Sequence, residues 1–120
     1  MKQNLLNEKS YAFAIRIVNM YKFIVDEKNE RVLSKQCLRS GTAVGALVAE
    51  SEHAQSKSDF LNKINIALKE ANETLYWLSL LHDTGFIGKN EYLSINADAT
   101  ELVKMLASIV KTTKQNLSRN

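Results

Sequence analysis

The chain contains no proline and only four glycines among its 120 residues. Proline breaks the interior of a helix because it lacks a backbone N–H and clashes with the preceding turn. Its absence therefore permits long uninterrupted helices. An all-β chain of this length would need many more glycine and proline turn signals, so that fold class is excluded.

Cysteine and long apolar runs are also scarce. The single cysteine, Cys37, excludes an internal disulfide. No apolar run reaches the roughly 18 residues that a membrane-spanning helix needs. The first eight residues are polar and do not resemble the start of a secretory signal. These absences predict a soluble protein of the reducing cytoplasm with no membrane partner.

The residues that are present are typical of a globular protein, with 45% hydrophobic and 24% charged side chains. The length predicts one domain over residues 1–120. The net charge of +3 makes the chain mildly basic. Such a charge permits contact with nucleic acid without requiring it.

Apolar residues recur every three or four positions, which is the spacing of helix faces. The pattern predicts helices over about residues 7–26, 31–53, 58–83 and 88–115, joined by short polar turns. In the first helix, the predicted apolar face consists of Ala14, Ile17, Val18, Tyr21, Ile24 and Val25. A weak point at residues 96–98 leaves open a short helix joined to a longer one. We expect an all-α, antiparallel up-down-up-down four-helix bundle.

The second predicted helix carries two glycines, Gly41 and Gly45, among other small residues. A glycine inside a helix costs about 1 kcal/mol relative to alanine. That cost favours close packing of a neighbouring helix here, with a kink as the competing explanation. In the third helix, Tyr76 and Trp77 are adjacent and cannot share one face. An aromatic side chain exposed in an oligomer interface is one interpretation, and a tryptophan at the edge of the bundle is the other.

Few residues suggest catalysis or metal binding. Glu50 and His53 have the Glu-x-x-His spacing of the ligands in di-iron bundles. Those bundles need two such motifs, and this chain has one. The favoured interpretation is therefore that both residues lie at a solvated helix end. Cys37 is better explained by a structural role than by catalysis. His82 is better explained by the favourable placement of a cationic imidazole near a helix C-terminus. We therefore expect no metal, no cofactor and no enzymatic activity.

The basic residues form a more informative pattern. Arg31, Lys35 and Arg39 are spaced by four and are predicted to line one face of the second helix, and no acidic residue lies between Arg31 and Ala49. A second acid-free stretch after Glu101 carries Lys104, Lys111, Lys114 and Arg119. Both stretches could contact phosphates, which proteins bind mostly through lysine and arginine. The alternative is that they are ordinary solvated helix faces.

Several segments between residues 33 and 87 carry a family resemblance. They are LSKQCLRS at 33–40, the small-residue helix that ends AE at 49–50, SDFL at 58–61, IAL at 66–68, ETL at 73–75, and L at 81 through GFI at 85–87. The order and spacing resemble the 23S rRNA intervening-sequence proteins, a four-helix-bundle family. The chain departs from the family pattern at residues 45–51, where the usual proline and asparagine are missing and Ser51 replaces glycine.

The resemblance implies a ring-like homo-oligomer, typically a pentamer of bundles, without established enzymatic activity. The family is similar to the accessory variability protein of diversity-generating retroelements, which works with a reverse transcriptase and nucleic acid. The leading hypothesis is a homo-oligomeric adaptor that binds structured RNA or RNA–DNA. Arg31, Lys35 and Arg39 are the first candidates for phosphate contact, followed by Lys104, Lys111 and Lys114. A protein-interaction module that binds no nucleic acid is the alternative.

Overall fold

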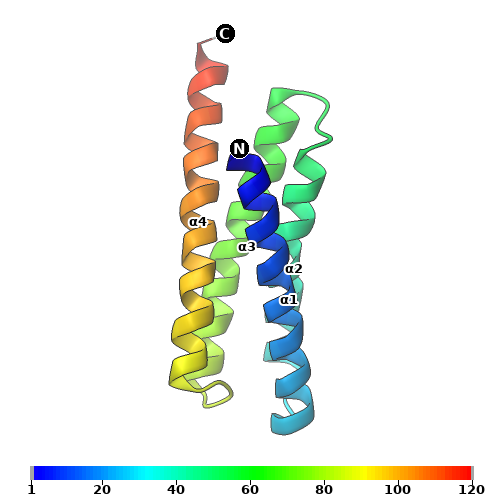
Figure 1. The fold of residues 1–120 in the computed structure, drawn as a ribbon, viewed down its shortest axis with the longest axis vertical. Coiled ribbons are helices and arrows are strands. Elements are labelled where there is room, and N and C mark those ends of the chain that lie inside the picture. The colour runs from blue at the N-terminus through cyan, green and yellow to red at the C-terminus, as the bar shows by residue number, and fades with distance from the viewer. Residues whose placement is uncertain (1, 120) are drawn as a thin grey trace.

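Four helices make up the computed structural model, which describes residues 2–119, with side chains from residue 4 onward. They are α1 (Lys2–Lys28), α2 (Leu33–Ser51), α3 (Lys57–Asp83) and α4 (Lys89–Ser118). Consecutive helices run in opposite directions along a molecule of 52 × 22 × 21 Å (Figure 1). The predicted all-α, four-helix fold is confirmed. No helix within the described residues is long and apolar enough to cross a membrane.

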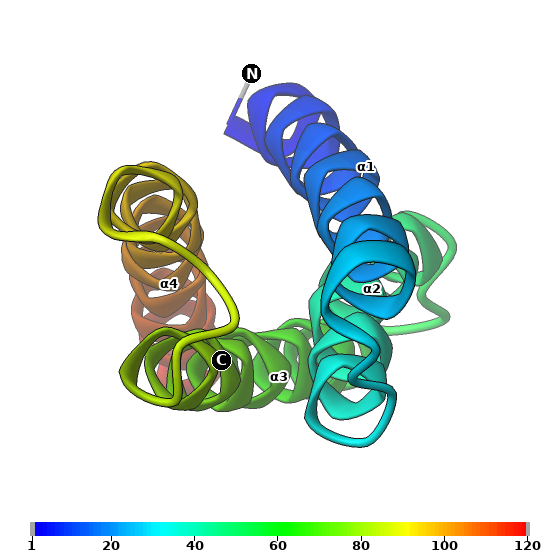
Figure 2. The same ribbon diagram turned by 90° about the horizontal axis from the view of Figure 1, so that it is seen from below.

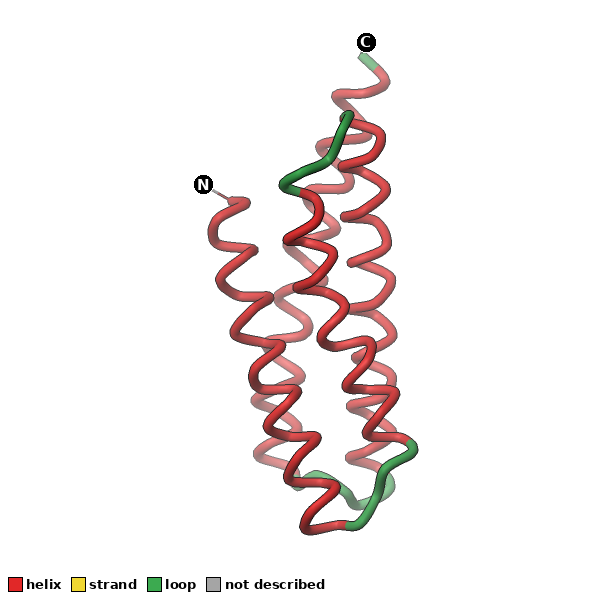
Figure 3. Tube along the Cα trace, turned by 90° about the vertical axis from the view of Figure 1, so that its right-hand side faces the viewer, coloured by secondary structure: helices red, strands yellow, loops and turns green. Residues whose placement is uncertain are grey.

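The helix boundaries differ from the predicted ones mainly at the first two helices. α1 is longer at both ends than predicted, and α2 begins two residues later and ends two residues earlier than predicted. α4 is continuous through residues 96–98, so the alternative of two joined helices is wrong. Only short loops separate the helices (Figure 3). Such loops hold successive helices side by side as antiparallel neighbours.

One apolar core joins all four helices. The stripes predicted on the third and fourth helices supply much of it, with Ile64, Leu78, Leu102 and Leu106 fully or almost fully buried. The buried face of α1 matches the predicted one only in part. It consists of Leu6, Phe13, Ile17, Met20 and Ile24. Ile17 and Ile24 were predicted, whereas the other four predicted residues, Ala14, Val18, Tyr21 and Val25, are only half-buried. Helix α1 is apolar on more than one side, so periodicity alone did not define the whole buried face.

The two glycines of α2 allow α1 to approach closely. A Cβ atom at Gly41 would lie 2.9 Å from Cγ1 of Ile17, and one at Gly45 would lie 3.2 Å from the backbone oxygen of Ser10. Both contacts are tighter than side chains normally tolerate. The prediction of close packing is therefore confirmed, and α2 runs as a single helix through both positions.

The chain ends and starts its helices with specific residues. After α1, Asn29 adopts a positive φ of 55°, which asparagine tolerates better than most residues. After α3, Gly85 takes the left-handed conformation that commonly ends a helix, with a φ of 87°. At the start of α3, Ser56 is the N-cap and its side chain accepts a hydrogen bond from the Asp59 backbone N–H.

Glu30 stabilises the start of α2 by accepting hydrogen bonds from its first backbone N–H groups, a role that was not predicted. Its carboxylate accepts hydrogen bonds from the backbone N–H groups of Val32, Leu33 and Ser34 at 2.7–2.8 Å. These donors belong to the first turn of a helix, where no intrahelical acceptor exists. Burial opposes ionisation of this carboxyl, but the backbone donors outweigh it and hold the pKa of Glu30 below its usual range.

Replacing Glu30 with alanine is expected to lower the free energy of unfolding by about 1–2 kcal/mol, because three backbone donors lose their acceptor. Urea unfolding followed by circular dichroism would measure the change. Glu27→Ala is a suitable control, since Glu27 is exposed in the last turn of α1 and caps no helix start. Equal stability of the two variants would contradict the capping role.

Candidate nucleic-acid interface

The six basic residues predicted to contact phosphate lie in two separate regions. Arg31, Lys35 and Arg39 lie at or near the end of the bundle that carries the α1–α2 turn. The C-terminal turns of α4, with Lys111 and Lys114, lie at the other end (Figure 1). Because the molecule is 52 Å long, the two groups do not form one continuous surface on a single chain.

Arg31 does not belong to a helical stripe. It precedes the first residue of α2, Leu33, so the prediction that Arg31, Lys35 and Arg39 line one face of one helix is wrong for Arg31. Its guanidinium donates a hydrogen bond to Oδ1 of Asn29 at 2.8 Å. Lys35 is exposed in the first turn of α2. These two cations therefore flank the α1–α2 turn.

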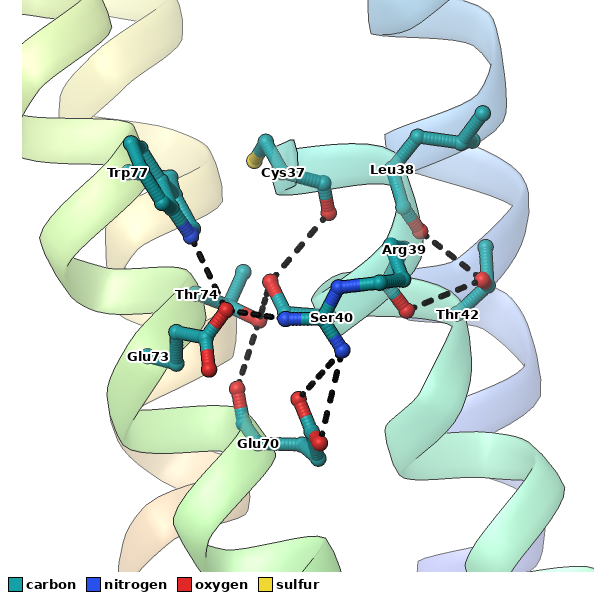
Figure 4. Close-up of polar contacts among 9 residues, drawn as sticks. All are labelled: Cys37, Leu38, Arg39, Ser40, Thr42, Glu70, Glu73, Thr74 and Trp77. Atoms are coloured by element: carbon teal, nitrogen blue, oxygen red, sulfur yellow. Dashed lines mark hydrogen bonds and ion pairs between the residues drawn. The ribbon is translucent and has the colours of Figure 1, made fainter. Parts of the chain in front are cut away.

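Arg39 is bound by two carboxylates of the neighbouring helix α3. Its Nη1 atom lies 3.3 Å from Oε1 of Glu70, and its Nη2 atom forms an ion pair with Glu73 (Figure 4). Trp77 donates a further hydrogen bond from Nε1 to Glu73 at 3.1 Å. Two acidic neighbours offset the positive charge of Arg39. The side chain therefore links α2 to α3 and is a weaker candidate for phosphate contact than its sequence position indicates.

A buried polar pair lies beside this link. Thr74 donates a hydrogen bond to the hydroxyl of Ser40 at 2.8 Å, and both residues are fully buried (Figure 4). Thr74 also approaches the backbone oxygen of Glu70 at 2.8 Å. Among the described residues, no buried side-chain nitrogen or oxygen lacks a hydrogen-bond partner. At this level the α2–α3 contact is thus polar, well satisfied and suited to holding the two helices in one register.

The Arg39 link predicts a specific loss of stability in acid. The hydrogen bond from Trp77 is the largest cause of the lowered pKa of Glu73, and the ion pair with Arg39 lowers it further. A carboxyl with a depressed folded-state pKa stabilises the fold above its unfolded pKa and loses that contribution as the pH falls through the folded pKa. We therefore expect stability to decline below the ordinary glutamate value of about 4.5. Glu73→Gln should flatten the decline in urea unfolding measured between pH 6 and pH 3, and an unchanged profile would contradict this role.

The cations of α4 have a different environment. Lys104, Lys111 and Lys114 are exposed, and none forms an ion pair with another described residue. No acidic residue follows Glu101 in the chain. The C-terminal turns of α4 also extend past the first turn of α1 (Figure 1). This half of α4 therefore carries exposed lysines without ion pairs to other described residues, with Glu101 beside Lys104.

The residues considered for other chemistry have structural explanations. Cys37 is fully buried, and burial raises the pKa of its thiol to about 12. His82 stacks on Tyr92 with ring centroids 4.5 Å apart, and its Nδ1 atom lies 3.1 Å from the backbone oxygen of Ile87. Within the described part of the chain, no group of three or more histidine, cysteine or acidic residues could hold a metal ion, so Glu50 and His53 gain no further ligands.

The adjacent aromatics of α3 point in different directions, as predicted. Tyr76 is exposed over 60% of its surface, and Trp77 is half-buried. Their rings meet edge to face with centroids 5.0 Å apart. Trp77 is thus the tryptophan at the bundle edge, and Tyr76 is the exposed aromatic available to a partner.

The family model of the 23S rRNA-intervening sequence protein matches residues 2–108. The chain belongs to this family. A crystal structure from Bacteroides thetaiotaomicron VPI-5482, described as a protein of unknown function from the S23 ribosomal protein family, is 59% identical. The match covers 92% of this chain and 99% of that one, with a TM-score of 0.91. No curated protein matches the chain.

Membership of the 23S rRNA-intervening sequence family confirms the resemblance carried by residues 33–87. One departure from the family pattern, Ser51, is accommodated locally. Its side chain is buried, and its hydroxyl donates to the backbone oxygen of Val48 at 2.6 Å. The family match ends at residue 108, so Lys111 and Lys114 lie beyond the matched segment while Lys104 lies within it.

Proposed function

We propose that this family member is a non-enzymatic homo-oligomeric adaptor that binds structured RNA or RNA–DNA through cationic helix faces. The observation that carries the proposal is the C-terminal half of α4, where Lys104, Lys111 and Lys114 are exposed and no acidic residue follows Glu101. Lysines in such a setting neutralise phosphates and release counterions from the nucleic acid. They position a ligand without reading its sequence.

The order of the candidate residues changes on structural grounds. Lys111 and Lys114 become the first candidates, with Lys104 beside them. Arg31 and Lys35 at the opposite end form a second group, because both are exposed. Arg39 is assigned to the α2–α3 link with Glu70 and Glu73.

Self-association would make these few cations effective. Three or four lysines per chain give weak binding alone, but several copies bound to one RNA raise the effective concentration of each contact. A pentamer is the assembly that the family resemblance implies. The partners proposed are therefore further copies of this chain, RNA, and a reverse transcriptase acting on the same nucleic acid.

The buried thiol does not fit a role as a catalytic nucleophile. A nucleophilic cysteine needs an accessible thiolate, which a lowered pKa provides. Cys37 has the opposite properties, since it is fully buried and its pKa is raised to about 12. Its side chain fits a role in packing.

The alternative is a protein-interaction module, and the exposed apolar side chains favour it. Tyr11, Ile15, Tyr76 and Leu93 are each about half exposed or more. Aromatic residues of this kind are enriched where proteins bind one another. A protein partner recovered equally well after nuclease treatment would support this reading over the adaptor.

Multi-angle light scattering of the protein alone and mixed with a structured RNA hairpin tests both parts of the proposal. The protein alone should have the mass of several chains, and the mixture should contain a heavier species that holds both components. A mass of 13.6 kDa for the protein would refute the oligomer. An oligomer that never gains RNA mass at low salt would refute nucleic-acid binding.

A further inference from the structure

Each pair of neighbouring helices in the bundle meets along a seam. The seam between α1 and α4 is the least closely packed. Seen along the bundle, α1 and α4 stand apart, while the other neighbouring helices lie against each other (Figure 2). Three hollows with volumes of about 460, 360 and 150 Å³ open along this seam. Each is lined by residues of both helices, including Phe23 in the first, Leu5 in the second and Ala12 in the third.

Charged side chains bridge this seam where apolar packing is sparse. Arg16 of α1 forms ion pairs with Glu91 at 2.8 Å and Asp98 at 2.9 Å, and it donates a hydrogen bond to Ser94 at 3.1 Å. Nearer the start of α1, Lys9 pairs with Glu101 at 3.1 Å. In each pair the cation comes from α1 and the anion from α4. All of these groups are at least one-third exposed.

The opposite side of α1 is held by close packing. Gly41 and Gly45 of α2 let the α1 backbone approach, and Ile17 fills the space above Gly41. Dispersion contacts of this kind do not depend on ionic strength. Attraction between exposed charges does, because the screening length falls from ~10 Å at 0.1 M salt to ~3 Å at 1 M. The two sides of α1 therefore respond differently to salt.

We propose that the ion pairs of Lys9 and Arg16 form an electrostatic latch that closes the α1–α4 seam. When the latch is screened or removed, α1 stays on α2 and moves away from α4, so the seam widens. The hollows beside Phe23 and Leu5 are the places where apolar surface becomes more accessible. The device does not include Lys111 or Lys114, the first candidates for phosphate contact, and it meets the cationic residues only at Lys104, which lines the hollow beside Leu5 with Glu101.

Distances between pairs of spin labels can test the latch. Cysteines introduced as Glu8→Cys and Ala107→Cys report on the α1–α4 seam, and Ala46→Cys with Asn65→Cys report on the α2–α3 seam; all four positions are exposed. Native Cys37 is buried and its raised pKa keeps it protonated, so it should not be labelled in the folded protein. Dilution of labelled chains into excess unlabelled protein isolates distances within one chain.

The latch predicts a longer and broader α1–α4 distance distribution in 1 M salt than in 50 mM salt, with the α2–α3 distribution unchanged. Arg16→Gln should show the open distribution already at 50 mM salt. Arg39→Gln is the matched control, because it removes an arginine that pairs with two carboxylates on a different seam. The proposal is wrong if neither salt nor Arg16→Gln lengthens the α1–α4 distance. It is also wrong if Arg39→Gln lengthens it to the same extent, or if both seams widen together.

Discussion

Replacing Gly41 with valine is expected to lower the free energy of unfolding by about 2–3 kcal/mol, the cost of overpacking a filled core. Even the first added carbon would lie 2.9 Å from the buried side chain of Ile17. Ile17 is completely buried within the apolar core. The α1–α2 contact would have to separate, and urea unfolding should show the loss as a lower transition midpoint.

Ala46→Val provides the control for this experiment. Ala46 is exposed on the same helix, so valine there adds only the helix-propensity cost of about 0.5 kcal/mol. A Gly41→Val variant no less stable than Ala46→Val would contradict the close approach of α1 to α2. Gly41→Ala should fall between the two, because its better helix propensity offsets part of the clash.

Reversing the charges of Lys111 and Lys114 together is expected to weaken binding to a structured RNA by at least about tenfold in 50 mM salt. Each reversal removes a favourable phosphate contact and adds a repulsive one, and a factor of ten requires only about 1.4 kcal/mol. Fluorescence anisotropy of a labelled hairpin would measure the change. The loss should be similar for RNAs of different sequence, because phosphate contacts carry no sequence information.

A second double variant separates a local effect from a change in net charge. Lys22→Glu with Lys69→Glu alters the total charge by the same amount, on exposed faces of α1 and α3. It should bind RNA more tightly than the Lys111→Glu, Lys114→Glu variant. Equal loss from the two variants would show that overall charge, and not the end of α4, governs binding.

The helical architecture could be read from the sequence because its signals are local. The absence of proline, the stripe through Ile64 and Leu78, and Gly85 after α3 each act within one helix or turn. The buried face of α1 was predicted less well, because that helix carries apolar residues on several sides. Which side is buried depends on where α2 approaches, and Gly41 and Gly45 determine that approach only once the helices are paired.

The environment of the basic residues depended on contacts between helices that are distant in sequence. Arg39 lies in an acid-free segment of the chain, yet folding brings Glu70 and Glu73 to it from α3. The sequence does contain one signal that could have predicted this contact. In an antiparallel pair, residues equally far from the connecting turn face each other, and Arg39 precedes the α2–α3 turn by about as much as Glu70 follows it. Lys111 and Lys114 keep the surroundings that the sequence predicts, because no acidic residue follows them and α4 extends past the first turn of α1.

The affinity of the wild-type oligomer for a structured RNA, measured across a salt series, tests the adaptor function most directly. Three lysines in contact with phosphate predict a straight line of log affinity against log salt concentration. Its slope should be about −2 or steeper, since each contact contributes about 0.7–0.9. Binding that is absent at 50 mM salt, or that stays unchanged as salt rises, would contradict the account and favour a protein-interaction module.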